Sequence, residues 1–384
     1  MSKYIPYGRQ SITDSDIQSV VKVLKCDFIT QGPQVRKFEK ALCISTQAKY
    51  AVAVSNGTAA LHLACLAAGI GKGDEVITSP LTFLASSNCV LYCGGKVVFA
   101  DIDSQTANIV SSEVEKNITK KTKAIIPVHF AGQPCEVDQI RDIGKKYNLI
   151  IIEDAAHALG AKYKGSHIGS CKYSDMTTLS FHPLKHITTG EGGAILTNRK
   201  DFYEKLLMLR SHGATKDNFV NKSEGDWYYE MQMLGFNYRI TDIQCALGVS
   251  QMKKLGKFVQ RRRRIVELYN KAFLDNPYFD IPIEKDHSFS SYHLYPIRVK
   301  TNYVHSRKDI FADLRKNGLG VQVHYFPVYL QPYYRELGYR KGLCPIAEQY
   351  YSKTISLPLY PKMLNSDVIK VIQVCMKVFD KYRN

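Results

Sequence analysis

Two residues that follow apolar runs, a lysine and an aspartate, are the side chains best suited to chemistry. Asp154 ends the run LIIIED, and Lys185 follows the run MTTLSFH. A carboxylate at the end of a buried strand is costly unless a cation or a donor faces it. Lys185 lies in a segment predicted to be partly enclosed, where burial lowers the pKa of an amine and makes it nucleophilic. The pair indicates Schiff-base chemistry; a helix cap at Asp154 and a surface charge at Lys185 are the simpler alternatives.

A candidate phosphate site lies upstream, in the segment SNGTAAL at 55–61. Here a β-rich run stops and a helix is predicted to begin near Gly57 and Thr58. A helix start presents free backbone N–H groups and the positive end of the helix dipole, both of which suit a phosphate. An N-cap that serves only the helix is the alternative.

The residues between Tyr50 and Thr197 predict the elements that position these side chains. Seven short β-rich runs alternate with helical segments, which is typical of a mainly parallel sheet covered by helices on both faces. Ligands of such sheets bind beyond the carboxyl ends of the strands. The expected strands are YAVAVS, DEVITSP, KVVFADID, KAIIPVHF, LIIIEDAA, MTTLSFH and GAILTN.

After about Gln251 the pattern changes to that of a smaller α+β domain. We therefore expect a large α/β domain over residues 1–250 and a small C-terminal domain over 251–384. The expected elements of the small domain are a long basic helix, a strand at HLYPIRV (293–299), a helix at 308–316, a strand at GVQVHYF (320–326) and a closing helix from about Ser366.

Composition excludes several classes of protein. With 384 residues, 45% hydrophobic and 23% charged, the chain is an ordinary globular protein. It has no apolar stretch of about 20 residues and no apolar leader, so we expect a cytoplasmic protein without a membrane partner. The ten cysteines are scattered, and no metal-site spacing occurs. The net charge of +17 favours anionic partners. We interpret Arg261–Arg264 as a solvated helix face, with nucleic-acid binding as a minor alternative.

Several further motifs occur in one order along nearly the whole chain. Together with the segments around Gly57, Asp154 and Lys185, the sequence resembles the DegT/DnrJ family of fold-type I, pyridoxal-phosphate-dependent aminotransferases that act on nucleotide-linked keto sugars. The further motifs are ITQGP (29–33), PLTFLAS (80–86), VHFAGQP (128–134), GFNYRITDIQCALG (235–248), HLYPI (293–297), QVHYFPVY (322–329) and SLPLYP (356–361).

The resemblance implies a role for each reactive residue. Lys185 would bind pyridoxal 5'-phosphate covalently and then carry the proton. Asp154 would pair with the pyridine nitrogen and keep it protonated, which makes the ring electron-withdrawing. His157 would lie near the ring hydroxyl. A lysine at position 185 favours amino transfer over dehydration, because related deoxygenating enzymes carry histidine there.

The resemblance also implies how the cofactor is held. Gly57, Thr58 and Ser180 would bind its phosphate, and Asn237 would reach the phosphate from a neighbouring subunit. The protein would then be a homodimer with shared active sites. Phe83 would stack on the ring, although an aromatic residue near a helix start is as often part of a core.

The finer similarity is to C4 aminotransferases of the pseudaminic acid pathway. It implies L-glutamate as amino donor and a UDP-linked 4-keto-6-deoxy sugar as acceptor. Bacillosamine-, perosamine- or viosamine-type sugars are alternative substrates, and a non-catalytic regulatory protein of the same fold is a further alternative. The expected substrate contacts are Tyr4, Tyr7, Thr30, His324, Tyr325 and the 216–226 segment.

Overall fold

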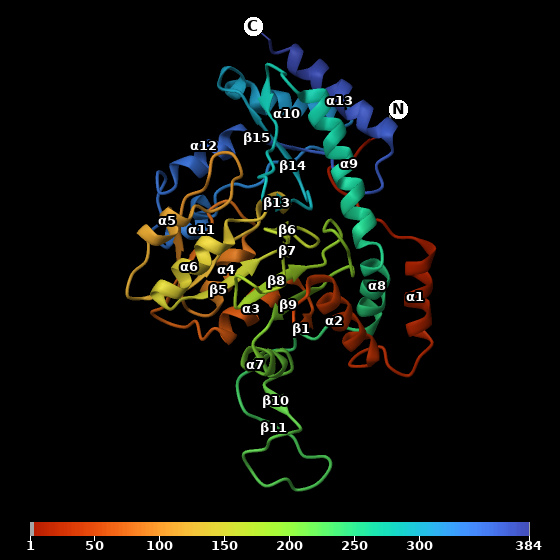
Figure 1. Cartoon of the computed structure of the whole chain (residues 1–384), viewed down its shortest axis with the longest axis vertical. Coiled ribbons are helices and arrows are strands. Elements are labelled where there is room, and N and C mark those ends of the chain that lie inside the picture. Colours follow the sequence, from red (N-terminus) through yellow and green to blue (C-terminus); the bar gives the residue numbers. More distant parts are fainter. Residues whose placement is uncertain (1–3, 384) are drawn as a thin grey trace.

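A seven-stranded sheet forms the centre of the computed structural model, which describes residues 4–383 (Figure 1). β9 is antiparallel to both of its neighbours, and the other neighbouring strands are parallel. The predicted α/β class with a mainly parallel sheet is therefore confirmed. In spatial order the strands are β1 (Tyr50–Val54), β9 (Gly193–Thr197), β8 (Met176–Ser180), β5 (Ile150–Asp154), β4 (Thr122–Ile126), β2 (Glu75–Thr78) and β3 (Lys96–Phe99).

Each face of this sheet has its own apolar core, because successive strand residues point to opposite faces. In β1, Val52 and Val54 belong to one core, and Ala51 and Ala53 belong to the other. α3 (Gly57–Ala67), α4 (Ala85–Tyr92) and α7 (Lys200–Arg210) contribute to the first core. α2 (Pro33–Thr46), α6 (Val137–Tyr147) and α8 (Asp242–Met252) contribute to the second. The sheet is thus buried on both faces, as its apolar strands require. Two further helices are α1 (Asp14–Leu24) and α5 (Ser111–Lys116).

The C-terminal part has a third core around a three-stranded antiparallel sheet. Its strand order is β12 (Phe279–Asp280), β14 (Tyr295–Val299) and β15 (Thr354–Leu357), and its main helices are α9 (Leu255–Phe273), α10 (Arg307–Lys316) and α13 (Asn365–Asp380). Ile5 from the N-terminal segment joins this core and forms a bridge with Leu319. The domain boundary at residue 250 stays a prediction.

The strand expected at 320–326 is wrong. This segment makes only an isolated bridge between Gln322 and Ser356, because the N-terminal segment lies against its start. A Cβ atom at Gly320 would lie 2.7 Å from the Tyr4 hydroxyl and 2.8 Å from Pro6 Cα. The Gly320 N–H also donates to the Ile5 carbonyl at 2.7 Å, so the start of the segment pairs with the N-terminal segment and not with a strand of the sheet.

The remaining elements are short, and one pair projects from the body. β10 and β11 form a hairpin stem whose loop extends away from the sheet (Figure 1). In the region 4–383, no helix is both long and apolar enough to cross a membrane. The short elements are β6 (Lys162–Tyr163), β7 (Ser166–His167), β10 (Ala214–Thr215), β11 (Glu230–Met231), β13 (Ser288–Phe289), α11 (Pro332–Glu336), α12 (Pro345–Lys353) and the 3-10 turns η1 (Phe130–Gly132), η2 (Thr301–Ser306) and η3 (Val328–Leu330).

The arginine run on α9 differs from the expected solvated face. Arg262 is 2% exposed, and its Nη1 donates to the carbonyls of Tyr292, His293 and Leu359 at 3.3, 3.2 and 2.9 Å. Burial lowers its pKa to about 10. Arg263 pairs with Glu284, and Arg261 donates to the Met363 carbonyl. Only Arg264 has the exposed position expected for all four, with Glu267 as its partner. The run therefore ties α9 to neighbouring loops, which weakens the nucleic-acid alternative.

Candidate active site

The sheet brings Asp154 and Ser180 together, because they end the neighbouring parallel strands β5 and β8. A cavity of about 800 Å³ opens beyond these ends. Its lining includes most of the residues predicted from the sequence: Tyr7, Gly57, Thr58, Phe83, Asp154, His157, Ser180, Lys185, His324 and Tyr325. One wall of the cavity is thus made by the carboxyl ends of parallel strands, where ligands of such sheets bind.

Three predicted residues lie outside this cavity. Tyr4 is exposed and packs beside Gly320. Thr30 forms an isolated bridge with Thr241, and Asn237 forms one with Ser211. Both Thr30 and Asn237 are exposed. Their predicted contacts with substrate or cofactor are not made within this one chain and stay predictions.

Lys185 lies on a turn after β8, where its backbone N–H donates to the carbonyl of His182 at 2.9 Å. Its side chain is half-buried in the cavity wall. Burial lowers the pKa of Lys185 to about 8, and the nearby Asp154 carboxylate opposes that shift. The amine is therefore far more often neutral near physiological pH than an exposed lysine, whose pKa is about 10.4.

Asp154 is held by two hydrogen bonds and faces the cavity. Its Oδ2 accepts from the Ser86 hydroxyl at 2.6 Å, and its Oδ1 accepts from the Ala156 N–H at 3.1 Å. Thr82 Oγ1 lies 2.6 Å from Ser86 Oγ. When Ser86 donates its proton to Asp154, the Thr82 hydroxyl donates to Ser86 Oγ. Sequence reasoning found the motif PLTFLAS but missed Ser86. Ser86 lies in the first turn of α4, and the signal that could have identified it is a serine at the start of a helix that follows a strand of the sheet.

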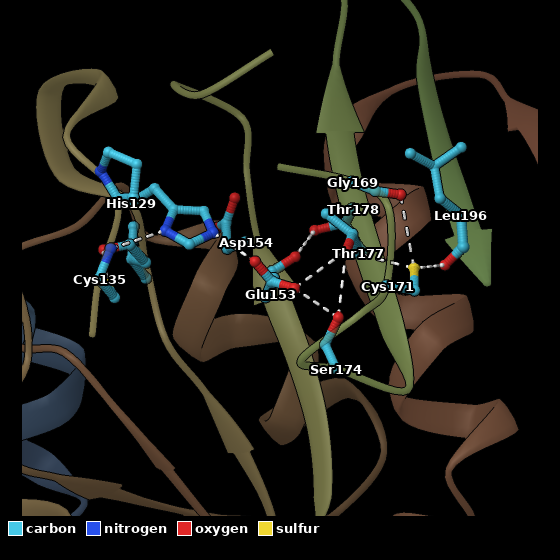
Figure 2. Close-up of polar contacts among 12 residues, drawn as sticks. His129, Cys135, Glu153, Asp154, Gly169, Cys171, Ser174, Thr177, Thr178 and Leu196 are labelled. Atoms are coloured by element: carbon cyan, nitrogen blue, oxygen red, sulfur yellow. Dashed lines mark hydrogen bonds and ion pairs between the residues drawn. The ribbon is translucent and has the colours of Figure 1, made fainter. Parts of the chain in front are cut away.

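Glu153 precedes Asp154 but lies in a closed network (Figure 2). His129 Nε2 is 2.8 Å from one carboxylate oxygen, and the hydroxyls of Ser174 and Thr177 donate to the other. The Cys135 N–H donates to His129 Nδ1 at 3.0 Å, so the ring proton must sit on Nε2 and point at Glu153. The protein itself therefore satisfies the buried carboxylate of Glu153.

The start of α3 forms a cradle for a phosphate. Asn56 caps the helix by accepting from the Ala59 N–H at 2.8 Å, which leaves the N–H groups of Gly57 and Thr58 without intrahelical acceptors. A Cβ atom at Gly57 would lie 2.8 Å from Ser180 Cβ. A Cβ atom at Gly193 would lie 2.4 Å from the Asn56 carbonyl oxygen. Both glycines therefore permit the close backbone packing that forms the cradle.

Buried histidines form the wall beside Lys185. The rings of His157 and His293 lie 4.2 Å apart, and the Tyr325 hydroxyl is 3.2 Å from His157 Nε2. Burial lowers the pKa of His157 and of His293 well below the usual range, and lowers that of His324 to about 3. These rings are neutral at pH 7. The Nδ1 atoms of His157 and His293 are buried without a hydrogen-bond partner among the described residues, so polar groups in this wall remain free for a ligand. His293 was not predicted, although HLYPI was a recognised motif.

Known proteins share this architecture over the whole chain. The transaminase named UDP-4-amino-4,6-dideoxy-N-acetyl-beta-L-altrosamine transaminase, from Campylobacter jejuni, is 39% identical over 99% of this chain and 98% of its own. The spore coat polysaccharide biosynthesis protein SpsC of Bacillus subtilis is 40% identical over 96% of each chain. Both identities are high enough to imply a common fold.

Solved structures give the same result. Helicobacter pylori PseC, an aminotransferase of pseudaminic acid biosynthesis, superposes with a TM-score of 0.92 at 34% identity, over 99% of this chain and 100% of its own. The PLP form of the sugar aminotransferase Spr1654 from Streptococcus pneumoniae superposes with a TM-score of 0.92 at 32% identity, with the same coverage. The family model for DegT/DnrJ/EryC1/StrS aminotransferases matches residues 10–376. This chain therefore belongs to the DegT/DnrJ/EryC1/StrS aminotransferase family.

Proposed function

We propose that this protein transfers the amino group of L-glutamate to C4 of UDP-2-acetamido-2,6-dideoxy-β-L-arabino-hexos-4-ulose. The product is UDP-4-amino-4,6-dideoxy-N-acetyl-β-L-altrosamine. The observation that carries the proposal is the Lys185 amine, with a pKa of about 8, in one cavity with the Asp154 carboxylate. The choice of sugar is supported by the Campylobacter transaminase, which is named after the proposed product.

The enzyme class and cofactor expected from the sequence are confirmed by the family, whose solved members include PLP and PMP forms of one sugar aminotransferase. The side chains of this protein fit that cofactor. The cradle at Gly57 offers free N–H groups to a phosphate, Asp154 offers a carboxylate to a ring nitrogen, and His157 has an unpartnered buried Nδ1. When bound, pyridoxal phosphate supplies an electron sink for the carbon that loses its proton.

We assign the positions around the cofactor from these contacts. Gly57, Thr58 and Ser180 hold the phosphate. Asp154, kept in place by Ser86, pairs with the ring nitrogen. Phe83 is 59% exposed but lines the cavity, which suits a ring that stacks on a ligand and not on a core.

Lys185 would hold and move the proton at the carbon that gives up or receives the amino group. A general acid–base works best when its pKa lies near the working pH, because both protonation states are then populated. Burial supplies this condition by lowering the pKa of Lys185 to about 8. The neutral histidines beside it add no positive charge that would lower the pKa further at pH 7.

The part of the cavity that Tyr7, His324 and Tyr325 line is assigned to the nucleotide sugar. The whole cavity, with a volume of about 800 Å³, is typical of small-molecule sites. The net charge of +17 attracts a pyrophosphate. SpsC, at 40% identity, favours a second candidate of the same class, a C4 aminotransferase for another sugar of a surface polysaccharide.

We assign Asn237 to the active site of a second copy of the chain, in a homodimer. Asn237 is exposed and lies outside its own cavity. The neighbouring arm, residues 214–234, carries exposed apolar side chains that a partner would cover: Val220, Trp227, Tyr229, Met231 and Leu234. The arm includes the 216–226 segment assigned to substrate. In a dimer, Asn237→Ala is expected to weaken cofactor retention without changing the oligomeric state. Equal cofactor affinity of this variant and the wild type, measured by equilibrium dialysis, would remove Asn237 from the site.

Steady-state kinetics on a panel of UDP-, GDP- and dTDP-4-keto sugars tests the function. Each sugar is tested with L-glutamate, and 2-oxoglutarate is measured as the second product. The expected result is the highest kcat/KM for the UDP-linked L-arabino-hexos-4-ulose. Lys185→Ala is the matched control and should form no 2-oxoglutarate with any sugar. A higher kcat/KM for a GDP or dTDP sugar refutes the assigned substrate, and turnover by Lys185→Ala refutes the mechanism.

A further inference from the structure

A second cavity, of about 660 Å³, lies at the edge of the central sheet and has no part in the proposed reaction. Its walls come from β1, the edge strand, and from α2 and α7, which both pack beside β1 (Figure 1). Among the described residues, none lines both this cavity and the first one. Successive side chains of the extended segment after Asn237 separate the two cavities: Tyr238 lines the first, and Arg239 lines the second.

The lining of this second cavity is strongly basic. Four of its cationic side chains have no side-chain hydrogen bond or ion pair with any residue in the region 4–383. Like charges around one hollow repel each other, and an anion that binds between them removes this repulsion. The cavity therefore suits a ligand with more than one negative charge. The four residues are Arg36, Lys40, Lys49 and Arg239.

The one carboxylate in the described part of this lining, Glu39, does not neutralise these four charges. Its Oε1 accepts from Arg210 Nη1 at 2.7 Å and from the Ala53 N–H at 3.0 Å. Arg210 Nη1 also donates to the Ala53 carbonyl at 2.8 Å, and Arg210 Nε is buried without a hydrogen-bond partner among the described residues. Glu39 and Arg210 thus compensate each other, which leaves the four other cations free for a ligand.

Two tyrosines add a flat aromatic surface to the cavity. The rings of Tyr50 and Tyr203 stack with their centroids 4.6 Å apart and an angle of 16° between their planes, and both residues line the cavity. A nucleoside diphosphate carries both groups that this lining can bind, because its pyrophosphate pairs with cations and its base packs on aromatic rings. A volume of about 660 Å³ is also within the range of small-molecule sites.

We propose that this second cavity is a nucleoside diphosphate site, separate from the active site. The four unpaired cations bind the pyrophosphate, and the Tyr50–Tyr203 pair contacts the base. Ser211 lines the same cavity and forms a bridge with Asn237, which we assign to the active site of a second copy. The experiments below therefore use the native oligomer with its cofactor bound.

The first experiment locates the nucleotide by photolabelling. The enzyme is irradiated with 5-azido-UDP, with and without an excess of UDP, and the labelled peptides are identified by mass spectrometry. We expect peptides that contain Tyr50 or Tyr203 to be labelled and UDP to protect them. Inorganic pyrophosphate should protect them less well than UDP, because it has no base to contact the tyrosines. Labelling confined to peptides of the first cavity, or equal protection by pyrophosphate and UDP, overturns the proposal.

The second experiment removes two of the cations. Arg36→Gln/Lys40→Gln changes two exposed side chains that lie one turn apart on α2. Lys308→Gln/Lys316→Gln is the matched control, because it removes two exposed charges from α10, outside this lining. The UDP concentration that half-protects the Tyr50 and Tyr203 peptides should rise about tenfold in the first variant and stay unchanged in the second. No rise in the first variant, or an equal rise in both, overturns the role of these cations.

Kinetics of the same two variants test whether the site is separate from the active site. The substrate is the nucleotide sugar with the highest kcat/KM for the wild type. We expect both variants to keep its KM within about twofold of the wild-type value, because neither changes a residue of the first cavity. A rise in KM that parallels the loss of protection would assign this cavity to the nucleotide of the substrate and overturn a separate site. Photolabelling does not measure transamination, so its outcome is independent of the proposed function.

Discussion

The two carboxylates at the end of β5 are neighbours in sequence but differ in what surrounds them. Glu153 points into the protein, where His129, Ser174 and Thr177 supply its hydrogen bonds. Asp154 lines a cavity, and its donors among the residues that the structure describes are the Ser86 hydroxyl and one backbone N–H. A buried carboxylate whose oxygens are fully hydrogen-bonded to the protein stabilises the fold. A carboxylate whose oxygens keep free lone pairs toward a cavity can also bind a ligand. The pair thus separates a structural role from a functional one at adjacent positions.

Asp154→Asn should have the largest effect on activity of the changes that test this contrast. An amide cannot keep a pyridine nitrogen protonated, so kcat/KM should fall by on the order of 10²–10³-fold. The free energy of unfolding should change by less than about 1 kcal/mol, because the side chain borders a cavity and an asparagine can accept from the Ala156 N–H while its NH₂ group donates to the Ser86 hydroxyl, which then donates to Thr82. Steady-state kinetics and urea unfolding of the same preparation measure both quantities. A loss of stability without a loss of kcat/KM would reverse the two assigned roles.

Glu153→Gln should show the opposite pattern. His129 must carry its proton on Nε2, so a glutamine must turn its Oε1 toward His129, and the hydroxyls of Ser174 and Thr177 must rotate to accept from its NH₂ group. We expect a loss of about 1–3 kcal/mol in the free energy of unfolding, because hydrogen bonds to a charged carboxylate are replaced by weaker ones to a neutral amide. The kcat per folded molecule should stay within about threefold of the wild type. Urea unfolding and active-site titration separate the two quantities, and a kcat loss above tenfold in fully folded protein would assign Glu153 to the catalytic side.

The sequence predicted the surroundings of Asp154 at the cavity better than the buried network around Glu153. Apolar strand runs that end at Asp154 and Ser180 predicted both the sheet and the place where these residues meet, because parallel strands share one carboxyl edge. The Glu153 network could not be predicted, since His129, Ser174 and Glu153 come from three separate segments and no spacing signals their contact.

Side chains that act across the fold were also beyond the sequence patterns. The charges of Arg261–Arg264 predicted a solvated helix face, but Arg262 is buried and donates to three backbone carbonyls. Every residue has a backbone carbonyl, so a sequence pattern does not indicate which carbonyls will accept these hydrogen bonds. The strand expected at 320–326 failed for a similar reason. The run GVQVHYF predicted a strand, but the close approach of Pro6 to Gly320 depends on tertiary structure.

Lys185, which also lines the cavity, makes the stability of the protein depend on pH because its amine is partly desolvated. Its pKa is about 8 in the folded protein and about 10.4 in the unfolded chain, so the unfolded chain binds more protons between these values. Stability contributed by this group therefore rises with pH from about 8 to 10.4. Because Lys185 keeps some solvent contact, we expect a gain of about 1–2 kcal/mol for the enzyme without cofactor.

Other groups titrate in the same range, so the measurement is a difference between two proteins. Urea unfolding of the cofactor-free wild type and of Lys185→Met is compared at pH 7.5 and pH 10. The stability advantage of the methionine variant should shrink as pH rises. An advantage that is constant or grows with pH would mean that the Lys185 amine is not desolvated.

The smallest effects come from the two serines that donate to the two carboxylates, and they form a matched pair. Ser86→Ala removes one donor from Asp154 and should lower kcat/KM by about tenfold or less, because the Ala156 N–H still orients the carboxylate. Ser174→Ala removes one donor from Glu153 and should cost about 1 kcal/mol of stability without a change in kcat/KM, since Thr177 and His129 remain. Each variant is measured by both kinetics and unfolding. If Ser86→Ala and Ser174→Ala lowered kcat/KM equally, the Glu153 network would affect catalysis as much as the Asp154 contacts do. The distinction between a structural Glu153 and a functional Asp154 would then be wrong.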